Sequence, residues 1–216
     1  MTLIVAINLN NYLFLASDQR LTIECEPSTG LPPRIHHDGY KKIRYWKHGA
    51  IVTSGDVILM DLFYKQLILK ENKPESELDL ILTSRIARVM YLQLGFPAAQ
   101  IYGCAFFSVY TEGKVELIHL SIKEDSIEYE TVKPMHAHFS LFAGLPDDPI
   151  YQQFVNYLKN VQSFELFKDF YNYHMELLKY FYKRQYSFDK SMTSTFDLFI
   201  QNKKNGKGFT QTIRNL

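Results

Sequence analysis

The second residue of the chain is a candidate nucleophile. Thr2 follows Met1, and methionine is normally removed when the next residue is small. A free N-terminal threonine carries a hydroxyl nucleophile and an amine base on the same residue. Many proteins begin with Met-Thr, so Thr2 indicates chemistry only where other residues support it.

Charged residues follow an apolar run in the segment Ala-Ser-Asp-Gln-Arg-Leu-Thr, residues 16–22. Taken alone, Asp18 and Arg20 would form an ion pair on a surface turn, which contributes little to stability. A lysine pair, Lys41 and Lys42, then opens the next predicted strand. If Lys42 points inward along that strand, its buried ammonium needs a partner, and Asp18 is a candidate.

An inward Lys42 would also affect the N-terminus. A cation held near Thr2 would lower the pKa of the free amine and favour its neutral, basic form. The alternative is that Lys41 and Lys42 form a solvated pair.

The segment Thr-Ser-Gly-Asp at residues 53–56 joins a predicted strand to a predicted helix. The backbone N–H of Gly55 could stabilise a developing oxyanion near the positive end of that helix. Alternatively, Ser54 or Asp56 only caps the helix. Each of these features is ambiguous alone, whereas their order and spacing along the chain are distinctive.

Together these residues resemble the proteasome β-subunit family of the N-terminal-nucleophile hydrolase superfamily, including its bacterial ATP-dependent peptidases. Members of this family begin their mature chain with threonine and then carry an Asp-x-Arg-x-Thr motif, which Asp18, Arg20 and Thr22 match at the family's spacing. The family's catalytic lysine corresponds to Lys42, and its oxyanion-hole glycine corresponds to Gly55.

The resemblance implies further site residues. Asp189 and Ser191 are the nearest equivalents of a family aspartate and serine that brace the N-terminal amine. The predicted substrate-binding residues surround the first specificity pocket and are Leu21, Thr22, Tyr40, Thr53 and Val57. Their side chains predict that this pocket accepts an apolar or neutral substrate side chain.

The sequence departs from the family pattern at two places. The segment between Thr22 and Lys42 is longer than usual. The family's Gly-Ser-Gly loop, whose serine assists the nucleophile, corresponds to Phe139–Pro146, where the sequence has Ala-Gly-Leu and no serine at the expected place. A non-catalytic ring subunit or scaffold therefore stays open as an alternative, as does an amidase that acts on a small amide.

Hydrophobic periodicity predicts the elements that position these residues. It predicts strands at 3–9, 12–16, 42–46, 50–53, 100–110, 115–121, 127–132, 138–143, 196–201 and 208–213. It predicts helices from Asp56, after Pro74, at 150–160 and at 163–185, and a long loop at 26–39. Strand blocks separated by helix pairs indicate an α+β fold. The resemblance implies a four-layer αββα sandwich that spans residues 1–216 as one domain.

Composition restricts the choice of partners and compartment. The 24 Lys and Arg residues nearly balance the 23 Asp and Glu residues, which argues against a nucleic acid as partner. Cys25 and Cys104 match no metal or redox spacing, so we expect a reduced, cytoplasmic protein, although a single disulfide stays open. The N-terminal apolar run lacks a preceding basic segment and is interrupted by asparagines, which predicts neither a signal peptide nor a membrane span.

Two histidine pairs are candidate metal ligands, His36 with His37 and His136 with His138. Neither has a cysteine or a clear carboxylate partner at ligand spacing, so we predict no metal and no cofactor. The aromatic residues between Phe164 and Tyr182 are more than one helix face can bury, which indicates a contact with another subunit.

The sequence therefore predicts a threonine peptidase. In this prediction Thr2 attacks a peptide carbonyl, and Lys42, paired with Asp18, tunes the amine. The resemblance implies a homo-oligomeric ring that degrades peptides or unfolded proteins. Members of the family often work with an ATP-driven unfoldase, although no residue of this sequence indicates that partner.

Overall fold

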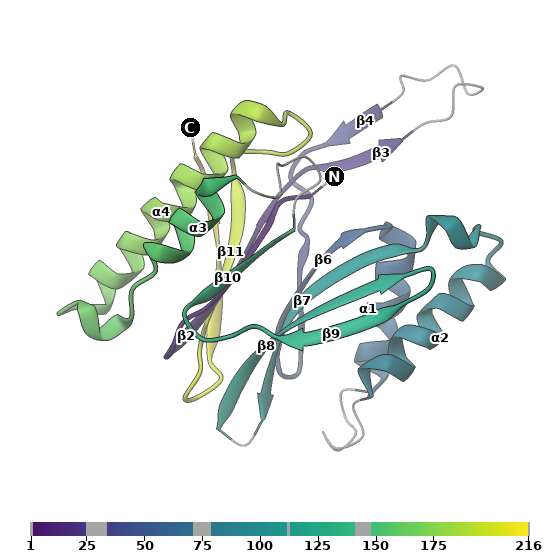
Figure 1. Ribbon diagram of the computed structural model, residues 1–216, viewed down its shortest axis with the longest axis horizontal. Helices are drawn as coiled ribbons and strands as arrows, with labels where there is room; N and C mark the ends of the chain where they lie inside the picture. Colours follow the sequence, from purple (N-terminus) through teal and green to yellow (C-terminus); the bar gives the residue numbers. More distant parts are fainter. Residues whose placement is uncertain (1, 25–33, 71–78, 112, 141–147, 216) are drawn as a thin grey trace.

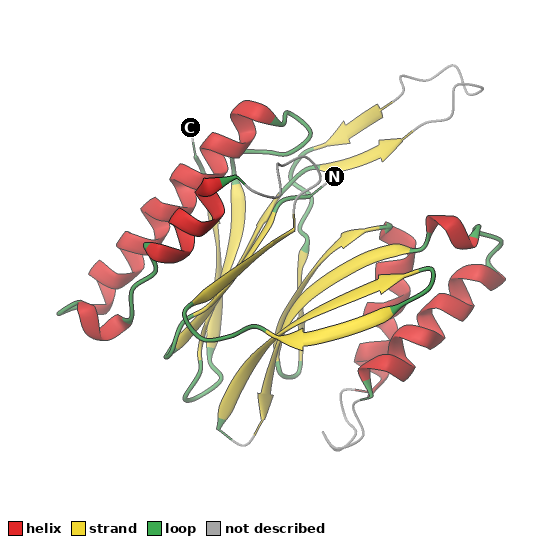
Figure 2. Cartoon of the chain, in the orientation of Figure 1, coloured by secondary structure: helices red, strands yellow, loops and turns green. Residues whose placement is uncertain are grey.

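Two antiparallel sheets form the centre of the computed structural model, which describes residues 2–24, 34–70, 79–111, 113–140 and 148–215. Helices cover the outer face of each sheet, so that the chain forms four layers (Figure 1). Colouring by secondary structure shows the same order, with helices on both outer sides and strands between them (Figure 2). The predicted α+β fold with an αββα sandwich is confirmed.

The first sheet has the strand order β10-β1-β2-β11-β12. These strands are β10 (His136–Ser140), β1 (Ile4–Asn8), β2 (Tyr12–Asp18), β11 (Phe196–Asn202) and β12 (Gly208–Ile213). The helices on its outer face are α3 (Pro149–Asn156) and α4 (Phe167–Phe188), which a short 3-10 turn at Val161–Ser163 separates.

The second sheet has the strand order β5-β6-β7-β8-β9. Its strands are β5 (Ile43–Trp46), β6 (Gly49–Gly55), β7 (Tyr102–Thr111), β8 (Lys114–Lys123) and β9 (Ile127–Thr131). Its outer face carries α1 (Val57–Lys70) and α2 (Leu80–Gln93), and a 3-10 turn at Ala98–Gln100 leads from α2 into β7.

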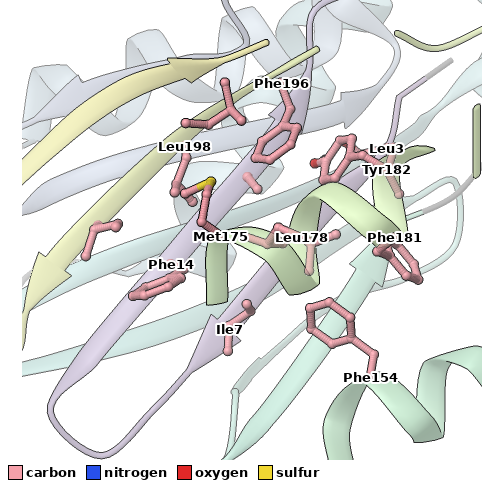
Figure 3. Packing of buried hydrophobic residues seen from close by; sticks show 14 of the residues in the cluster. Leu3, Ile7, Phe14, Phe154, Met175, Leu178, Phe181, Tyr182, Phe196 and Leu198 are labelled. Carbon is pink, nitrogen blue, oxygen red and sulfur yellow. The ribbon is translucent and has the colours of Figure 1, made fainter. Parts of the chain in front are cut away.

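The first strand is apolar from Ile4 to Ile7 because both of its faces are buried. Ile4 and Ala6 belong to the core between the sheets, whereas Val5 and Ile7 belong to the core beneath α3 and α4. Successive side chains of a strand point to opposite faces, so a strand between two cores needs no polar alternation. The outer core is rich in aromatic and sulfur-containing side chains, as Figure 3 shows for Phe14 and Met175. This packing holds the chain start beside Thr2 in place.

One predicted loop is partly a strand. Residues 34–37 form β4 (Arg34–His37), which pairs with β3 (Leu21–Glu24) in a separate two-stranded sheet. This hairpin projects away from the two main sheets (Figure 1). The prediction of a loop over 26–39 is therefore wrong at 34–37, because backbone pairing with residues 21–24 outweighs the many turn residues nearby. Residues 25–33 lie outside the described part.

The helix predictions are confirmed with shifted ends. Helix α2 begins at Leu80 because the side chain of Asp79 accepts a hydrogen bond from the N–H of Leu82 at 2.9 Å, which caps the helix. Helix α4 begins at Phe167 rather than at residue 163. The predicted helix start after Pro74 and the end of the predicted strand at 141–143 lie outside the described residues.

None of the described helices is long and apolar enough to cross a membrane. Cys104 is buried. Cys25 lies outside the described residues, so the question of a disulfide is untested.

Candidate active site

A pocket of about 340 Å³ lies where β6 passes into α1. The predicted site residues that line it come from separate parts of the chain and are Thr2, Leu21, Tyr40, Lys42, Thr53, Gly55 and Val57. The fold thus brings the candidate nucleophile, the candidate lysine and the candidate oxyanion glycine to one cavity. Their roles in chemistry stay predictions.

A buried ion pair borders this pocket. Lys42 Nζ lies 2.6 Å from Asp18 Oδ1, and the two side chains are 4% and 0% exposed. The carboxylate accepts two further hydrogen bonds, from the backbone N–H of Leu3 to Oδ1 and from that of Arg20 to Oδ2, both at 2.9 Å. Because charges cost much free energy to bury without partners, this close set of bonds makes a buried lysine tolerable. The solvated-pair alternative for Lys42 is therefore excluded.

Strand pairing places Asp18 beside the chain start. Strands β1 and β2 are antiparallel neighbours in which Ile4 lies opposite Ser17, so β2 ends where β1 begins. The backbone N–H of Asp18 donates to the carbonyl of Leu3 at 3.1 Å, and the hydroxyl of Tyr182 donates to the same carbonyl at 3.3 Å. Leu3, the residue after Thr2, is thus held by hydrogen bonds at both its N–H and its carbonyl. These bonds orient Thr2 at the pocket.

Burial changes the acidity of the lysine. Removal from water lowers the pKa of Lys42 below its usual value, the neighbouring Asp18 raises it, and the charge of Arg20 lowers it further. Desolvation is the largest of these effects and disfavours the charged form of any buried amine. The ammonium of Lys42, beside the pocket that Thr2 lines, is therefore more acidic than that of an ordinary lysine, and its pKa is lowered mainly by burial.

Gly55 lies at the sharp turn from β6 into α1. Its φ is +96°, a left-handed value that favours glycine, and a Cβ there would lie 2.8 Å from the Cα of Gly103 and would also strike the carbonyl of Tyr102. Asp56 then caps the helix, because its Oδ1 accepts the N–H of Leu59 at 2.8 Å. The cap that the sequence suggested is present, and the positive end of α1 follows directly after Gly55, which lines the pocket.

Arg20 connects this region to the predicted C-terminal pair. Its guanidinium binds Asp38 through two bonds, at 2.5 and 2.7 Å, and donates another to the carbonyl of Lys190. On either side of Lys190, the N–H and hydroxyl of Ser191 donate to Asp189 Oδ1 at 2.8 and 2.5 Å. Asp189 and Ser191 therefore form a small turn tied to the Asp18 segment, but neither is among the described residues that line the pocket.

Thr22 is also not among the described residues that line the pocket. It lies on β3, and its hydroxyl is 2.9 Å from His36 Nδ1 on β4. Leu21 lies on the same strand but lines the pocket, so Thr22 is the one of the five residues predicted to bind substrate that does not line it.

The pocket also carries charges that the sequence-based analysis missed. Arg44 Nη1 and Lys65 Nζ bind Asp61, at 2.9 and 2.8 Å, and all three residues line the cavity. The prediction of an apolar or neutral substrate side chain did not take these charges into account. The sequence does indicate part of this charged set. Asp61 and Lys65 are four residues apart on a predicted helix, so their side chains lie on one face, and Asp61 lies one turn after Val57.

The region of the missing family serine is only partly described. Residues 141–147 lie outside the described part, so the departure noted at 143–145 is not tested. The preceding residue, Ser140, has its hydroxyl 2.8 Å from the hydroxyl of Ser54, next to Gly55.

Comparison with known proteins finds relatives of this fold among solved structures. No protein-family model matches the sequence, and no curated protein matches it significantly. A Gly-1 mutant of Anbu from Hyphomicrobium sp. strain MC1 superposes with a TM-score of 0.64 at 12% identity, over 99% of this chain and 87% of that one. A second structure of Anbu from the same strain gives 0.61 at 13% identity, over 98% and 87%.

Anbu from Yersinia bercovieri, described as an ancestral beta-subunit, gives a TM-score of 0.61 at 10% identity, over 96% of this chain and 86% of that one. At such low identity the likeness concerns the fold. The chain has an αββα fold similar to that of Anbu, which is the fold that the sequence resemblance implied.

We predict that Lys42→Met destabilises the protein by about 3–5 kcal/mol, because it leaves Asp18 as a buried carboxylate without its cation. The exposed neighbour gives a matched control, and Lys41→Met should change the free energy of unfolding by less than about 0.5 kcal/mol. The double variant Asp18→Asn/Lys42→Met should regain most of the loss. Urea unfolding measures all three variants, and equal effects at positions 41 and 42 would contradict the buried pair.

We also predict that Gly55→Ala destabilises the protein more than Gly95→Ala. Both glycines have left-handed φ values, +96° and +88°, but only at Gly55 does an added Cβ meet other atoms within 4 Å. The shared backbone strain costs about 1–2 kcal/mol, and the clash should add about 1–3 kcal/mol at Gly55. Thermal unfolding tests this difference, and similar losses at the two positions would show that the close approach to β7 is absent.

Proposed function

We propose that this chain is a threonine peptidase whose nucleophile is Thr2 after removal of Met1. The main support for this proposal is the buried ion pair of Lys42 and Asp18, because Lys42 lines the same pocket as Thr2. A buried ion pair contributes little net stability, because the cost of desolvation offsets most of the attraction between the charges. A functional reason for burying a lysine at this pocket is therefore the stronger explanation.

The proposed reaction begins with the hydroxyl of Thr2. Its oxygen attacks the carbonyl carbon of a peptide bond, and its own α-amine accepts the hydroxyl proton. The positive charge of Lys42 disfavours a second nearby cation, so it keeps that amine neutral and basic. The amine then passes the proton to the leaving amine of the substrate, which leaves an ester between Thr2 and the acyl fragment. A water molecule, deprotonated by the same amine, hydrolyses this ester.

Backbone geometry supports stabilisation of the intermediate. The tetrahedral intermediate carries negative charge on the former carbonyl oxygen, which requires donors oriented in advance. Gly55 stands at the exposed end of β6, directly before the capped N-terminus of α1. We assign its N–H to the oxyanion in this proposal, with the helix end adding a favourable dipole.

A ring of identical subunits is part of the proposal. Several large apolar side chains near α4 are exposed, such as Tyr180 at 62%, Phe188 at 72% and Leu166 at 61%. Exposed apolar residues gathered on one element are typical of subunit contacts. Anbu from Yersinia bercovieri, which shares the fold, is itself described as a beta-subunit. An ATP-driven unfoldase would fit such a ring as a partner, and a cytoplasmic location would fit both.

Hydrolysis of a panel of fluorogenic peptides tests the proposal. The panel should present apolar, acidic and basic side chains before the scissile bond, because the pocket has both apolar and charged walls. We expect Thr2→Ala to lower kcat at least about a thousandfold, as removal of a nucleophile does in other hydrolases. Thr2→Ser should retain part of the activity, since it keeps both the hydroxyl and the amine.

Size-exclusion chromatography of each variant provides the control, because the assembly should be the same in all of them. Turnover that persists in Thr2→Ala would rule out the mechanism. A wild-type protein that assembles but cleaves no peptide would favour the non-catalytic subunit, and cleavage of small amides alone would favour the amidase.

A further inference from the structure

A second cluster of chemically reactive side chains lies away from the pocket, at the edge of the two sheets. His119 comes from β8, Glu130 from β9 and His138 from β10. One potential ligand atom from each residue lies within 4.8 Å of the other two. None of the three residues lines the pocket of Thr2, so this cluster is separate from the proposed active site.

Strand pairing explains how the cluster forms. His119 and Glu130 are directly opposite each other in the antiparallel pair of β8 and β9, so their side chains share one face of the second sheet. His138 belongs to β10, the edge strand of the first sheet, where it lies opposite Ala6 of β1. The cluster therefore joins two sheets that also pack against each other through the apolar inter-sheet core.

The orientation of β10 supports this convergence. Ser140 lies two residues after His138, so both side chains project from the same face of the strand. The hydroxyl of Ser140 contacts that of Ser54 on β6, 2.8 Å away, which shows that this face looks across to the second sheet. His138 is thus presented to His119 and Glu130 by the same strand face that carries Ser140.

The distances in the cluster fit metal ligands better than hydrogen bonds. His119 Nδ1 lies 3.4 Å and His138 Nδ1 lies 3.7 Å from the same atom, Glu130 Oε1. Hydrogen bonds from nitrogen to oxygen have their most frequent length near about 2.9–3.0 Å, so both contacts are long for that role. Ligands bound about 2.0–2.1 Å from a tetrahedral Zn²⁺ are about 3.3–3.4 Å apart, which is close to both contacts.

Neighbouring side chains hold the imidazoles in place. The ring of His119 stacks on Phe106, with ring centroids 4.7 Å apart and planes inclined by 13°. The ring of His138 meets both His119 and Phe106 edge to face, at 5.4 and 6.3 Å. The histidine side chains are 26% and 31% exposed, whereas Glu130 is 61% exposed. The cluster is therefore partly preformed and remains open to an ion from solvent.

We propose that His119, Glu130 and His138 bind one Zn²⁺ ion that ties β10 of the first sheet to β8 and β9 of the second. Two imidazoles and one carboxylate are a donor set that zinc prefers, and water would occupy the fourth position. Because the ligands come from both sheets, the ion would hold the sheets at a fixed separation at this edge. The site is independent of the chemistry of Thr2.

Zinc binding to the full chain tests this proposal directly. Untagged protein, stripped of metal with a chelator, is titrated with Zn²⁺ in competition with a chromophoric chelator. We expect one equivalent per chain, and a Kd at least about a hundredfold weaker in His138→Gln and in Glu130→Gln, because loss of a ligand exceeds the effect of losing an outer-shell partner. His37→Gln, which removes a histidine from the distant β4, should bind like the wild type.

Two readouts on folded protein complete the test. Zinc should raise the Tm of the wild type by about 5 °C or more when it is well above its Kd, and should leave that of His138→Gln unchanged. Cobalt bound to the wild type in place of zinc should give the strong visible absorption of a tetrahedral ion. This measurement requires no variant protein. Absence of stoichiometric binding, an octahedral cobalt spectrum, or wild-type affinity in both variants would overturn the proposal.

Discussion

The burial of Lys42 and Asp18 is the constraint on which the rest of this site depends. Two charges removed from water need a short contact and satisfied donors, and the fold provides both. The carboxylate is held by the backbone of Leu3, at the start of the first strand, and by that of Arg20, just after the second. Since both N–H groups belong to fixed strand ends, the position of the residue before Leu3 follows from the position of the ion pair. The position of Thr2 is therefore set by the ion pair and the hydrogen bonds that the Asp18 carboxylate makes.

The other half of the pocket depends on a single backbone turn. At Gly55 the chain leaves a sheet and enters a helix with a left-handed φ, in close contact with the neighbouring strand. Asp56 immediately caps the helix and also accepts a hydrogen bond from the hydroxyl of Tyr91 on α2 at 3.0 Å. The turn is thus anchored to β7 on one side and to the second helix on the other. Such anchoring suits a site in which donors must be oriented before the substrate binds.

Much of the fold could be predicted from the sequence because its signals are local. Alternating or continuous apolar runs identified the strands, and the cap at Asp56 identified the start of α1. The approach of Asp18 to Lys42 could also be predicted, since an inward lysine requires an anion. The strand β4 could not, because its pairing with residues 21–24 is a contact across a segment rich in turn residues.

Two further features that the sequence did not predict share one cause. The charged wall of the pocket, Arg44 with Asp61, joins a strand to a helix face. The cluster of His119, Glu130 and His138 combines side chains from three strands of two sheets. In the sequence, His138 has no carboxylate at ligand spacing, and only the register of β8 with β9 and the stacking of the sheets supply one. Spacing along a chain does not report such contacts, whereas tertiary packing creates them.

Labelling with a peptide epoxyketone tests whether Thr2 is the nucleophile, because this reagent reacts with both the hydroxyl and the free amine of an N-terminal threonine. The labelled protein is digested, and the mass of its N-terminal peptide is measured. We expect a peptide that begins at Thr2, lacks Met1 and carries one molecule of the reagent. A peptide that retains Met1, or one that begins at a free Thr2 yet stays unlabelled, would contradict the assignment of Thr2 as the nucleophile.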